Sequence, residues 1–534
     1  MSKIINEIVV VGGGSAGWMT ASILIKDFPN KKITLIESPD IPKVGVGEST
    51  YDGINYFIKY LDIDRDDFFT FTNASIKLGI EFENFYENNN TSFVYPFGWA
   101  YLNNSFWGMQ DWLIRKCKDS SIPVTDFVKT YFPVSHLIEY NTFNENKNNE
   151  LPNFIPEIHT ALHFDAHKFA FWLQEKYAKV RGVNHIVSTV KNIKQNKDGI
   201  ESLTLADNTK ISADLFIDCT GFSALLIDKA LKEEFIDYTD RLPNNSAWAT
   251  TIPYVDIEKE LTGVTKCTFL NNGWVWNIPL YSRIGTGYVY SDKFINDDDA
   301  LKEFKNYLLD KNLTNIKFKE EIDKLNFKNI KMRVGIHKNT WVKNVAAIGL
   351  AAGFVEPLES NGLFTVHEFL FNLVSILKEE KITSWHIHAY NEKNYRIYDS
   401  FAQFIQAHYA LSVRDDSKYW KTNSEKKYNF DKININNKES SFLFKLYDRK
   451  TRTSETFGYG GFDTGLTCVA IGMNYFILDS VSTQVGEISS NQNYSKLLQN
   501  YWESSDKEKI KWNEIAKQSE TMYNYLRRKY HNDK

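Results

Sequence analysis

Three glycines near the N-terminus have the spacing of a turn that binds a dinucleotide. They stand as Gly12-x-Gly14-x-x-Gly17, after an apolar run from Ile8 to Val11 and within a helical pattern that continues to about Lys26. The first glycine permits a tight turn, the second lets the backbone approach a pyrophosphate, and the third lets the helix pack on the strand. The helix N-terminus would then face the phosphates. The spacing therefore predicts a strand, a turn and a helix that bind a dinucleotide.

An acidic residue follows at the position that such a fold uses for ribose. The segment KKITLIES is typical of a second strand and ends in Glu37, about 20 residues after Gly17, where a carboxylate would accept from ribose hydroxyls. A nicotinamide domain would need a second glycine fingerprint, and GYGGFDTG at 458–465 has the wrong spacing. FAD is therefore favoured over NAD.

Two later segments indicate strands that return to the same site. ADLFIDCTGFSALL (213–226) contains a buried strand followed by Asp218 and a Thr-Gly turn, and residues 344–377 contain a strand ending near Gly349 and an apolar helix beginning near Asn361. We expect an α/β fold: a doubly wound, Rossmann-like FAD sheet of the aromatic-hydroxylase type, with an inserted substrate-domain β-sheet and a mainly helical C-terminal region.

The expected organisation places the FAD module at residues 1–380. Substrate-side segments at about 51–200 and 230–335 would interrupt that module, and residues 381–534 would form a mainly helical substrate or lid region.

Composition excludes several classes of protein. The 534 residues are 43% hydrophobic and 24% charged, and the net charge of -4 gives no basic excess for nucleic acid. Four scattered cysteines form no C-x-x-C pair, so we expect no metal site and a reducing, cytoplasmic setting. No signal peptide and no apolar run of about 18 residues is visible, so no membrane partner is expected. The composition does not decide whether the chain forms a homo-oligomer.

Two tryptophans stand close together in GWVWNIPL (273–280). Alone, this alternation is typical of a half-buried strand that Pro279 would end.

The same segment is part of a wider resemblance. Trp274, Trp276, Ile278 and Pro279 match the W-x-W-x-I-P signature of flavin-dependent halogenases of the tryptophan-halogenase type. The following segments also resemble that family, in order along the chain: GGGSAGWMTA (12–21), VGVGEST (44–50), SIKLGIEF (75–82), HFDA (163–166), DLFIDCTGF (214–222) and GFVEPLES (353–360). The resemblance runs from residue 1 to roughly 420.

The resemblance implies an activity. In that family, reduced FAD and oxygen convert halide into hypohalous acid, which travels through a tunnel to a lysine that delivers the halogen to an aromatic substrate. The signature tryptophans lie near the tunnel and keep the substrate from the flavin. We therefore expect a small free aromatic substrate, indole-like or phenol-like, and a separate NAD(P)H-dependent flavin reductase.

Two residues match the catalytic positions of the family. Lys77 stands where the family has its lysine, and its ammonium could hydrogen-bond hypohalous acid or, as an amine, form a haloamine. Glu359 matches the second essential residue, and its carboxylate could stabilise the arenium ion or remove its proton. Glu356 is an alternative only three residues away, and the family pattern favours Glu359.

The cofactor and halide positions follow from the same resemblance. The expected cofactor-binding residues are Gly12, Gly14, Ser15, Ala16, Gly17, Glu37, Gly47, Glu48, Ser49, Thr50, Asp218, Gly221, Gly349 and Leu350. Ser360, Asn361 and Gly362 begin a helix, whose free N–H groups suit a halide ion. The family has threonine where Asn361 stands, so a preference for bromide or iodide is a hypothesis.

The substrate side is less marked in the sequence. AHYALSVRDDSKYW (407–420) resembles the family's substrate region, and His408, Tyr409, Tyr419 and Trp420 are candidate ring contacts. The pattern of the last 40 residues predicts an amphipathic helix, which we expect to serve packing and solvation.

Two alternatives belong to other functional classes. The first is an FAD-dependent monooxygenase that hydroxylates its substrate, against which Lys77 and the W-x-W-x-I-P signature argue. The second is a catalytically inactive flavin-binding protein, which the departure at Asn361 keeps open.

Overall fold

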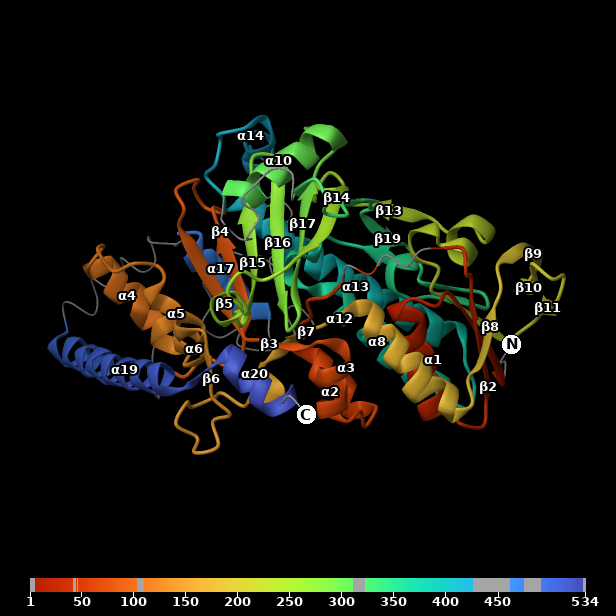
Figure 1. Cartoon of the computed structure of the whole chain (residues 1–534), viewed down its shortest axis with the longest axis horizontal. Helices are drawn as coiled ribbons and strands as arrows, with labels where there is room; N and C mark the ends of the chain where they lie inside the picture. The colour runs from red at the N-terminus through yellow and green to blue at the C-terminus, as the bar shows by residue number, and fades with distance from the viewer. Residues whose placement is uncertain are drawn as a thin grey trace.

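A mainly parallel sheet forms one of the two large layers of the fold. The computed structural model describes residues 5–41, 45, 47–102, 110–310, 322–425, 462–474 and 491–531. Six strands run in the order β20 (Trp341–Val342), β21 (Val345–Ala347), β12 (Leu215–Asp218), β1 (Glu7–Val11), β2 (Lys32–Glu37) and β8 (Asn184–Val187). Only the edge pair β20–β21 of this sheet is antiparallel. Segments far apart in the sequence therefore meet in one sheet, at the right of Figure 1.

The predicted strand, turn and helix are present at the N-terminus. Helix α1 (Ser15–Asp27) follows β1 directly, and the turn between them begins with Gly12 at a φ of +116°. A side chain at Gly12 would place its Cβ 2.2 Å from the carbonyl oxygen of Cys219, and one at Gly17 would lie 1.8 Å from the carbonyl oxygen of Gly12. Glycine is required at both positions because the backbone approaches so closely.

A second, mostly antiparallel sheet stands beside the first. Its order is β18 (Lys328–Lys331), β14 (Ser246–Ile252), β17 (Arg283–Tyr290), β16 (Gly273–Leu280), β15 (Val264–Phe269), β4 (Gly79–Glu83) and β5 (Ser92–Pro96). Only β15 and β4 pair in parallel. The α/β fold with an inserted sheet is thus confirmed (Figure 1).

The tryptophan-rich strand differs from its prediction. Strand β16 passes through Pro279 to Leu280, and all eight of its residues are buried. It is buried on both faces because helix α10 (Asp297–Asp310) covers the second one, where Val275 packs with Tyr288 and Phe304. The expectation of a half-buried strand ending at Pro279 is therefore wrong.

The remaining elements connect and cover these sheets. The small sheets contain β3 (Ser75–Lys77) with β7 (Ala161–His163), β6 (Thr142–Phe143) with β23 (Glu520–Thr521), β9 (Val190–Asn196) with β10 (Gly199–Leu205) and β11 (Lys210–Ile211), and β13 (Phe235–Asp237) with β19 (Gly335–His337) and β22 (Gly353–Phe354). The helices before residue 260 are α2 (Gly53–Tyr60), α3 (Arg65–Thr72), α4 (Gln110–Lys118), α5 (Asp126–Tyr131), α6 (Val134–Tyr140), α7 (Pro156–His159), α8 (Ala166–Trp172) and α9 (Ile257–Glu260). Short π and 3-10 helices are η1 (Leu173–Ala178), η2 (Lys179–Arg181), η3 (Gly221–Ser223), η4 (Leu225–Ala230), η5 (Gly349–Ala351) and η6 (Pro357–Glu359).

The C-terminal region is mainly helical, as expected. Its helices are α12 (Asn361–Leu377), α13 (Ser384–Ala410), α14 (Lys418–Glu425), α17 (Phe462–Gly472), α19 (Gln492–Gln518) and α20 (Met522–Tyr530). Figure 1 shows α19, in blue, beside the orange helices α4 to α6, and Arg115 of α4 forms two 2.8 Å hydrogen bonds with Asp506 of α19. Among the described residues, no helix has the length and apolar character needed to cross a membrane.

Candidate active site

Three turns converge at one edge of the parallel sheet. Gly349 at the start of η5 faces α1, and a Cβ there would lie 2.9 Å from the Cβ of Ala16. The contact between Gly12 and Cys219 brings the turn after β12 to the same place. The turns predicted from three separate segments therefore lie together. Their residues include Gly221 and Leu350.

The glycines of this region fit a dinucleotide. Apart from chain neighbours and the backbone of the glycine's own helix, no atom of the described residues lies within 4 Å of the position that a Cβ would take at Gly14, Gly47, Gly221 or Gly362. Helix α1 also begins without a side-chain cap, so its first N–H groups are free to meet phosphates. An open cradle of backbone beside a helix N-terminus is the arrangement that a pyrophosphate requires.

Glu37 lies at the turn, as its spacing predicts. A Cβ at Gly13 would lie within 2.5 Å of the Glu37 side chain, so a larger residue there would displace this carboxylate. Asp218 holds the turn after β12, because its carboxylate accepts from Thr220 and from the N–H groups of Leu226 and Ile227. Its contact with the cofactor stays a prediction.

Lys77 is fully buried at a break between two strands. The segment SIKLGIEF divides at Leu78, so that β3 pairs with β7 while β4 joins the large sheet. Leu78 N–H donates to Gly263 O at 2.6 Å and Leu78 O accepts from Phe97 N–H at 2.7 Å. Lys77 therefore ends β3 at the junction of the two sheets.

The Lys77 ammonium has two oxygen partners. Nζ donates to Thr50 O at 2.9 Å and to Ser360 Oγ at 2.8 Å, and it lies 4.9 Å from the ring centroid of Phe97. Burial lowers the pKa of Lys77 from 10.5 to about 7, and the nearby Glu359 carboxylate opposes this shift. Both the ammonium and the amine are consequently populated near neutral pH.

A chain of buried hydroxyls extends from Lys77. Ser360 Oγ lies 2.9 Å from Ser49 Oγ, which lies 2.7 Å from Thr265 Oγ1, and the latter lies 2.8 Å from His163 Nε2. Burial and the charge of Lys77 hold the pKa of His163 well below its usual value, so this histidine is neutral. Sequence reasoning missed Thr265 because it lies in an ordinary strand pattern.

The segment that carries Gly47, Glu48, Ser49 and Thr50 is held by an ion pair. Glu48 accepts from Arg283 of β17 at 2.5 and 3.1 Å, and burial raises the pKa of the Glu48 carboxyl. This tether fixes the backbone that places Thr50 O against Lys77. The predicted cofactor segment therefore also belongs to the lysine site.

The two acids of the EPLES segment are both fully buried, but only one is hydrogen-bonded. Glu356 Oε2 accepts from Tyr409 Oη at 2.6 Å, Asn244 Nδ2 at 2.9 Å and Trp274 Nε1 at 3.2 Å. Neither oxygen of Glu359 accepts a hydrogen bond from a described residue. Glu359 instead lies 2.8 Å from His408 Nε2, at ion-pair distance. The structure thus separates a structural acid from one that is available for chemistry.

The signature tryptophans are held by their neighbours. Trp274 donates to Glu356, and Trp276 lies over Gly287, where an added Cβ would come within 2.2 Å of the indole. Ile278 and Pro279 continue the buried strand.

The candidate substrate residues lie on α13 and α14. Tyr419 Oη donates to Asn244 at 3.1 Å and so joins the Glu356 network, while Trp420 Nε1 donates to Leu270 O at 2.8 Å. All four candidate rings are buried. Their contact with a substrate stays a prediction.

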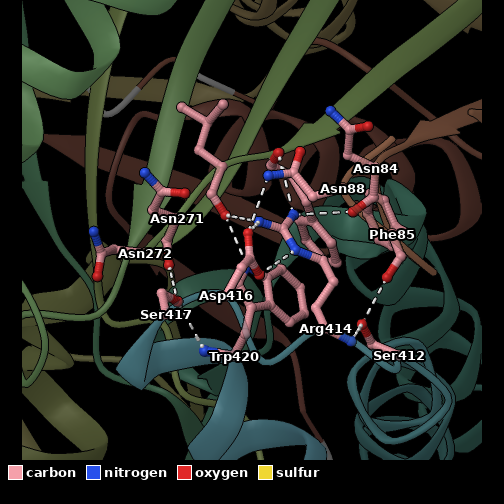
Figure 2. A network of polar contacts seen from close by, with 12 residues as sticks. Asn84, Phe85, Asn88, Asn271, Asn272, Ser412, Arg414, Asp416, Ser417 and Trp420 are labelled. Carbon is pink, nitrogen blue, oxygen red and sulfur yellow. Dashed lines mark hydrogen bonds and ion pairs between the residues drawn. The ribbon is translucent and has the colours of Figure 1, made fainter. Parts of the chain in front are cut away.

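Arg414 holds the loop between α13 and α14 in place. Figure 2 shows its guanidinium among backbone carbonyls, where it donates to Asn84 O at 3.0 Å and Leu270 O at 3.3 Å and pairs with Asp416. It also lies 4.5 Å from the Trp420 ring centroid. One side chain therefore joins this loop to two loops of the large sheet.

Helix α12 begins beside Lys77. Ser360 has a φ of +57° and precedes the first turn, which has no side-chain cap. Asn361 is buried, and its Oδ1 has no hydrogen-bond partner among the described residues. Free N–H groups and an amide that can rotate by half a turn are suitable donors for an anion.

Comparison with known proteins agrees with this fold. The model of the family described as tryptophan halogenase matches residues 7–444. The tryptophan 7-halogenase RebH of Lentzea aerocolonigenes is 34% identical over 442 residues, 80% of each chain. The VirX1 apo structure superposes with a TM-score of 0.87 at 33% identity, over 99% of this chain and 100% of that one. Tar14, a tryptophan C-6 flavin-dependent halogenase from taromycin biosynthesis, has a TM-score of 0.80 at 29% identity, over 98% and 99% of the two chains.

The fold is therefore that of a flavin-dependent halogenase, an oxidoreductase. The chain belongs to the tryptophan halogenase family. Membership implies FAD as the cofactor, oxygen and halide as co-substrates, a small aromatic substrate and a separate flavin reductase.

Proposed function

We propose that this enzyme halogenates a small free aromatic molecule, indole-like or phenol-like, at Lys77. The observation that carries the proposal is a fully buried lysine, held by Thr50 O and Ser360 Oγ and coupled electrostatically to a buried acid, Glu359. Bound FAD, once reduced, supplies with oxygen and halide the hypohalous acid that this site uses.

The lysine has one donor left for the reagent. An ammonium carries three N–H groups, and two of them point to Thr50 O and Ser360 Oγ. The third can hold the oxygen of hypohalous acid and make the halogen more electrophilic. The Phe97 ring lies against Nζ and Lys77 is fully buried, so water is excluded from this position.

Glu359 can complete the substitution. As the arene attacks the halogen, the C–X bond forms and the X–O bond breaks, and the oxygen leaves as water with the proton of Lys77. The arenium ion then loses its ring proton to Glu359. Because Glu359 accepts no other hydrogen bond from the described residues, its lone pairs are available for this proton.

The start of α12 supports a halide site at Ser360, Asn361 and Gly362. An asparagine amide is a softer, longer donor than the hydroxyl that stands here in the family, so we infer a preference for bromide or iodide. The open space beside Gly362 is consistent with a large anion.

A panel experiment tests the substrate class, the halide and the lysine together. Indoles, phenols and anilines would be incubated with enzyme, FAD, a flavin reductase, NADH and chloride, bromide or iodide in competition, and the products analysed by mass spectrometry. We expect halogenated products, mainly brominated or iodinated, that disappear in Lys77→Met. Oxygenated products would indicate a hydroxylase, and a chloride preference would contradict the inference on Asn361.

A further inference from the structure

A series of buried hydrogen bonds joins Lys77 to the backbone of the tryptophan-rich strand β16. Beyond Thr265 the series passes through the imidazole of His163, whose Nδ1 lies 3.3 Å from Ser75 Oγ. It ends where Ser75 Oγ donates to Pro279 O at 2.5 Å. Its polar side chains are all buried. We call this series the Lys77–Pro279 network, and its members, in order, are Lys77, Ser360, Ser49, Thr265, His163, Ser75 and Pro279.

The direction of these hydrogen bonds is set at the Pro279 end. A carbonyl oxygen can only accept, so the single hydrogen of the Ser75 hydroxyl points to Pro279 O. Ser75 Oγ therefore accepts from Nδ1 of His163. Burial and the charge of Lys77 hold the pKa of His163 well below its usual value, so the ring carries only this one hydrogen. Nε2 then has a lone pair, and Thr265 Oγ1 donates to it at 2.8 Å.

The same direction continues to Lys77. Because the hydrogen of Thr265 points to His163, Thr265 Oγ1 accepts from Ser49. Ser49 Oγ in turn accepts from Ser360. The Ser360 hydroxyl consequently presents a lone pair to Nζ of Lys77, from which it accepts at 2.8 Å. A hydroxyl that donates is also a better acceptor, so these bonds strengthen one another.

The network has room for one cation, at its Lys77 end. An ammonium only donates, which agrees with a Ser360 hydroxyl that accepts. Both nitrogens of an imidazolium at His163 would also donate, so Thr265 would have to accept and its hydrogen would point back toward Lys77. Two hydrogens would then meet on one bond of the network. The geometry therefore requires a neutral His163 while Lys77 is charged.

The direction of the network matters most when Lys77 is an amine, which is a substantial fraction near its pKa of about 7. An amine has two N–H groups and one lone pair. Its two neighbours, Thr50 O and Ser360 Oγ, are both acceptors, so they take the two hydrogens. The lone pair is left in the third position, where the proposed function places the reagent. If Ser360 turned round, its hydroxyl would donate to this lone pair instead.

We propose that His163 is a positioning residue for Lys77, because it keeps the Ser360 hydroxyl an acceptor and so directs the third position of Nζ to the reagent. In the ammonium that position is an N–H group, and in the amine it is the lone pair. The inference rests on the proposed function and names a further residue of the same site. It also gives a role to the carbonyl of Pro279, which fixes the direction at the far end.

Thr265→Val tests this role, because valine has the shape of threonine but has no hydroxyl. Without this member Ser49 and Ser360 can turn round, so that Ser360 donates to the Lys77 amine and stabilises it. We expect the pH midpoint of Lys77 to fall by about one pH unit. The midpoint would be measured by NMR on protein labelled with ¹³Cε-lysine, with the signal assigned by its loss in Lys77→Met. The groups that interact electrostatically with Lys77 are unchanged by this variant and are Glu359, Cys267, Asp52 and His163.

Two matched controls separate the network from the loss of a buried hydroxyl. Thr265→Ser keeps the hydroxyl and should keep the wild-type midpoint of Lys77. Thr268→Val removes a buried hydroxyl of the same strand, which donates to Glu83 at 2.9 Å outside the network, and should also leave that midpoint unchanged. An unchanged midpoint in Thr265→Val, or an equal fall in Thr268→Val, would overturn the inference. If Thr265→Val does not fold, His163→Phe removes the Nε2 acceptor and should lower the midpoint in the same way.

The partition of oxidised halide reads out the positioning in the reaction itself. At about pH 8, where Lys77 is mainly an amine, the ratio of ring product to trapped hypohalous acid should be about tenfold lower in Thr265→Val than in the wild type. At about pH 5.5 the ammonium dominates and Ser360 accepts in both proteins, so the ratios should agree within about twofold. An equal loss at both pH values would indicate a merely structural role and overturn the positioning.

The two measurements distinguish failure of this inference from failure of the proposed function. If the wild type halogenates no arene, the proposed function is wrong, whereas a lower Lys77 midpoint in Thr265→Val would still establish the direction of the network. If the wild type halogenates an arene and Thr265→Val has the wild-type midpoint and partition, the proposed function stands and His163 does not position Lys77.

Discussion

At the scale of single residues, Lys77 lowers the stability of the fold in order to function. Its pKa of about 7 in the folded chain lies below the ordinary 10.5 because burial disfavours the charged form. Below pH 7 both the folded and the unfolded chain bind this proton, and the folded chain carries the full penalty. As pH rises from about 7 to 10.5, the unfolded chain binds more protons than the folded chain and stability increases.

Lys77→Met should therefore be more stable than the wild type at pH 6, by up to a few kcal/mol. The lost contacts with Thr50 O and Ser360 Oγ offset part of this gain. Chemical denaturation at several pH values would measure the difference, which should shrink as pH rises above 7. A Lys77→Met variant that is less stable at every pH would contradict the buried ammonium.

Glutamine substitutions at the two acids of the EPLES segment should affect different properties, stability at Glu356 and halogenation at Glu359. Glu356→Gln weakens three charge-assisted hydrogen bonds and should lower the free energy of unfolding by about 1–3 kcal/mol. Glu359→Gln loses no hydrogen bond from a described residue, so its stability should stay within about 1 kcal/mol while halogenation falls at least 10²-fold. Thermal unfolding and product yield would be measured on both variants. Lower stability in Glu359→Gln together with lost halogenation in Glu356→Gln would show that the two roles are reversed.

At the scale of elements, the α13–α14 loop depends on Arg414. Arg414→Ala leaves the buried carbonyl oxygens of Asn84 and Leu270 without this donor and breaks an ion pair with the exposed Asp416. The lost donor should cost about 1–3 kcal/mol. Arg396→Ala on α13 removes an exposed pair with Glu392 and should cost about 0.5 kcal/mol or less. Equal losses in denaturation experiments would show that the network in Figure 2 does not hold the loop.

The turn between β1 and α1 allows a matched pair of glycine variants. Gly12→Ala should unfold the turn, because φ is +116° and the new Cβ meets Cys219 O. The new Cβ of Gly14→Ala lies within 4 Å of no described residue beyond its neighbours in the chain, so the variant should fold normally, but its methyl group enters the space proposed for the pyrophosphate. The rise in melting temperature on adding FAD should then be reduced in Gly14→Ala. A full FAD shift in that variant would exclude this turn as the pyrophosphate site.

How far the sequence predicts these elements depends on the range of the interactions. Strands β1 and β2 and helix α1 lie close to their predicted bounds because glycine spacing and apolar runs are local signals. The break at Leu78 was not predicted because Gly263, from a distant segment, accepts its N–H. Strand β16 is buried on both faces only because α10 packs on it, which no alternation within the strand could indicate.

At the scale of the whole molecule, the site lies where the two sheets meet. Lys77 ends a strand beside the large sheet, while Glu359 and Ser360 belong to the segment that leads from the parallel sheet into α12. Motifs in the sequence predict Lys77 and Glu359 as catalytic residues, but the different hydrogen bonding of Glu356 and Glu359 depends on the positions of Asn244, Trp274 and Tyr409. The family explains the cofactor, and the packing of the two sheets explains the burial of the lysine.

The central claim is that Lys77 transfers the halogen to the arene. The most direct measurement is the partition of one equivalent of oxidised halide between ring product and a hypohalous acid trap, in the wild type and in Lys77→Met, with equal FAD and reductase. The wild type should place the halogen on one carbon of the arene, and Lys77→Met should release the same amount of oxidant to the trap alone. Formation of the same regioisomer in the same yield by Lys77→Met would contradict the account.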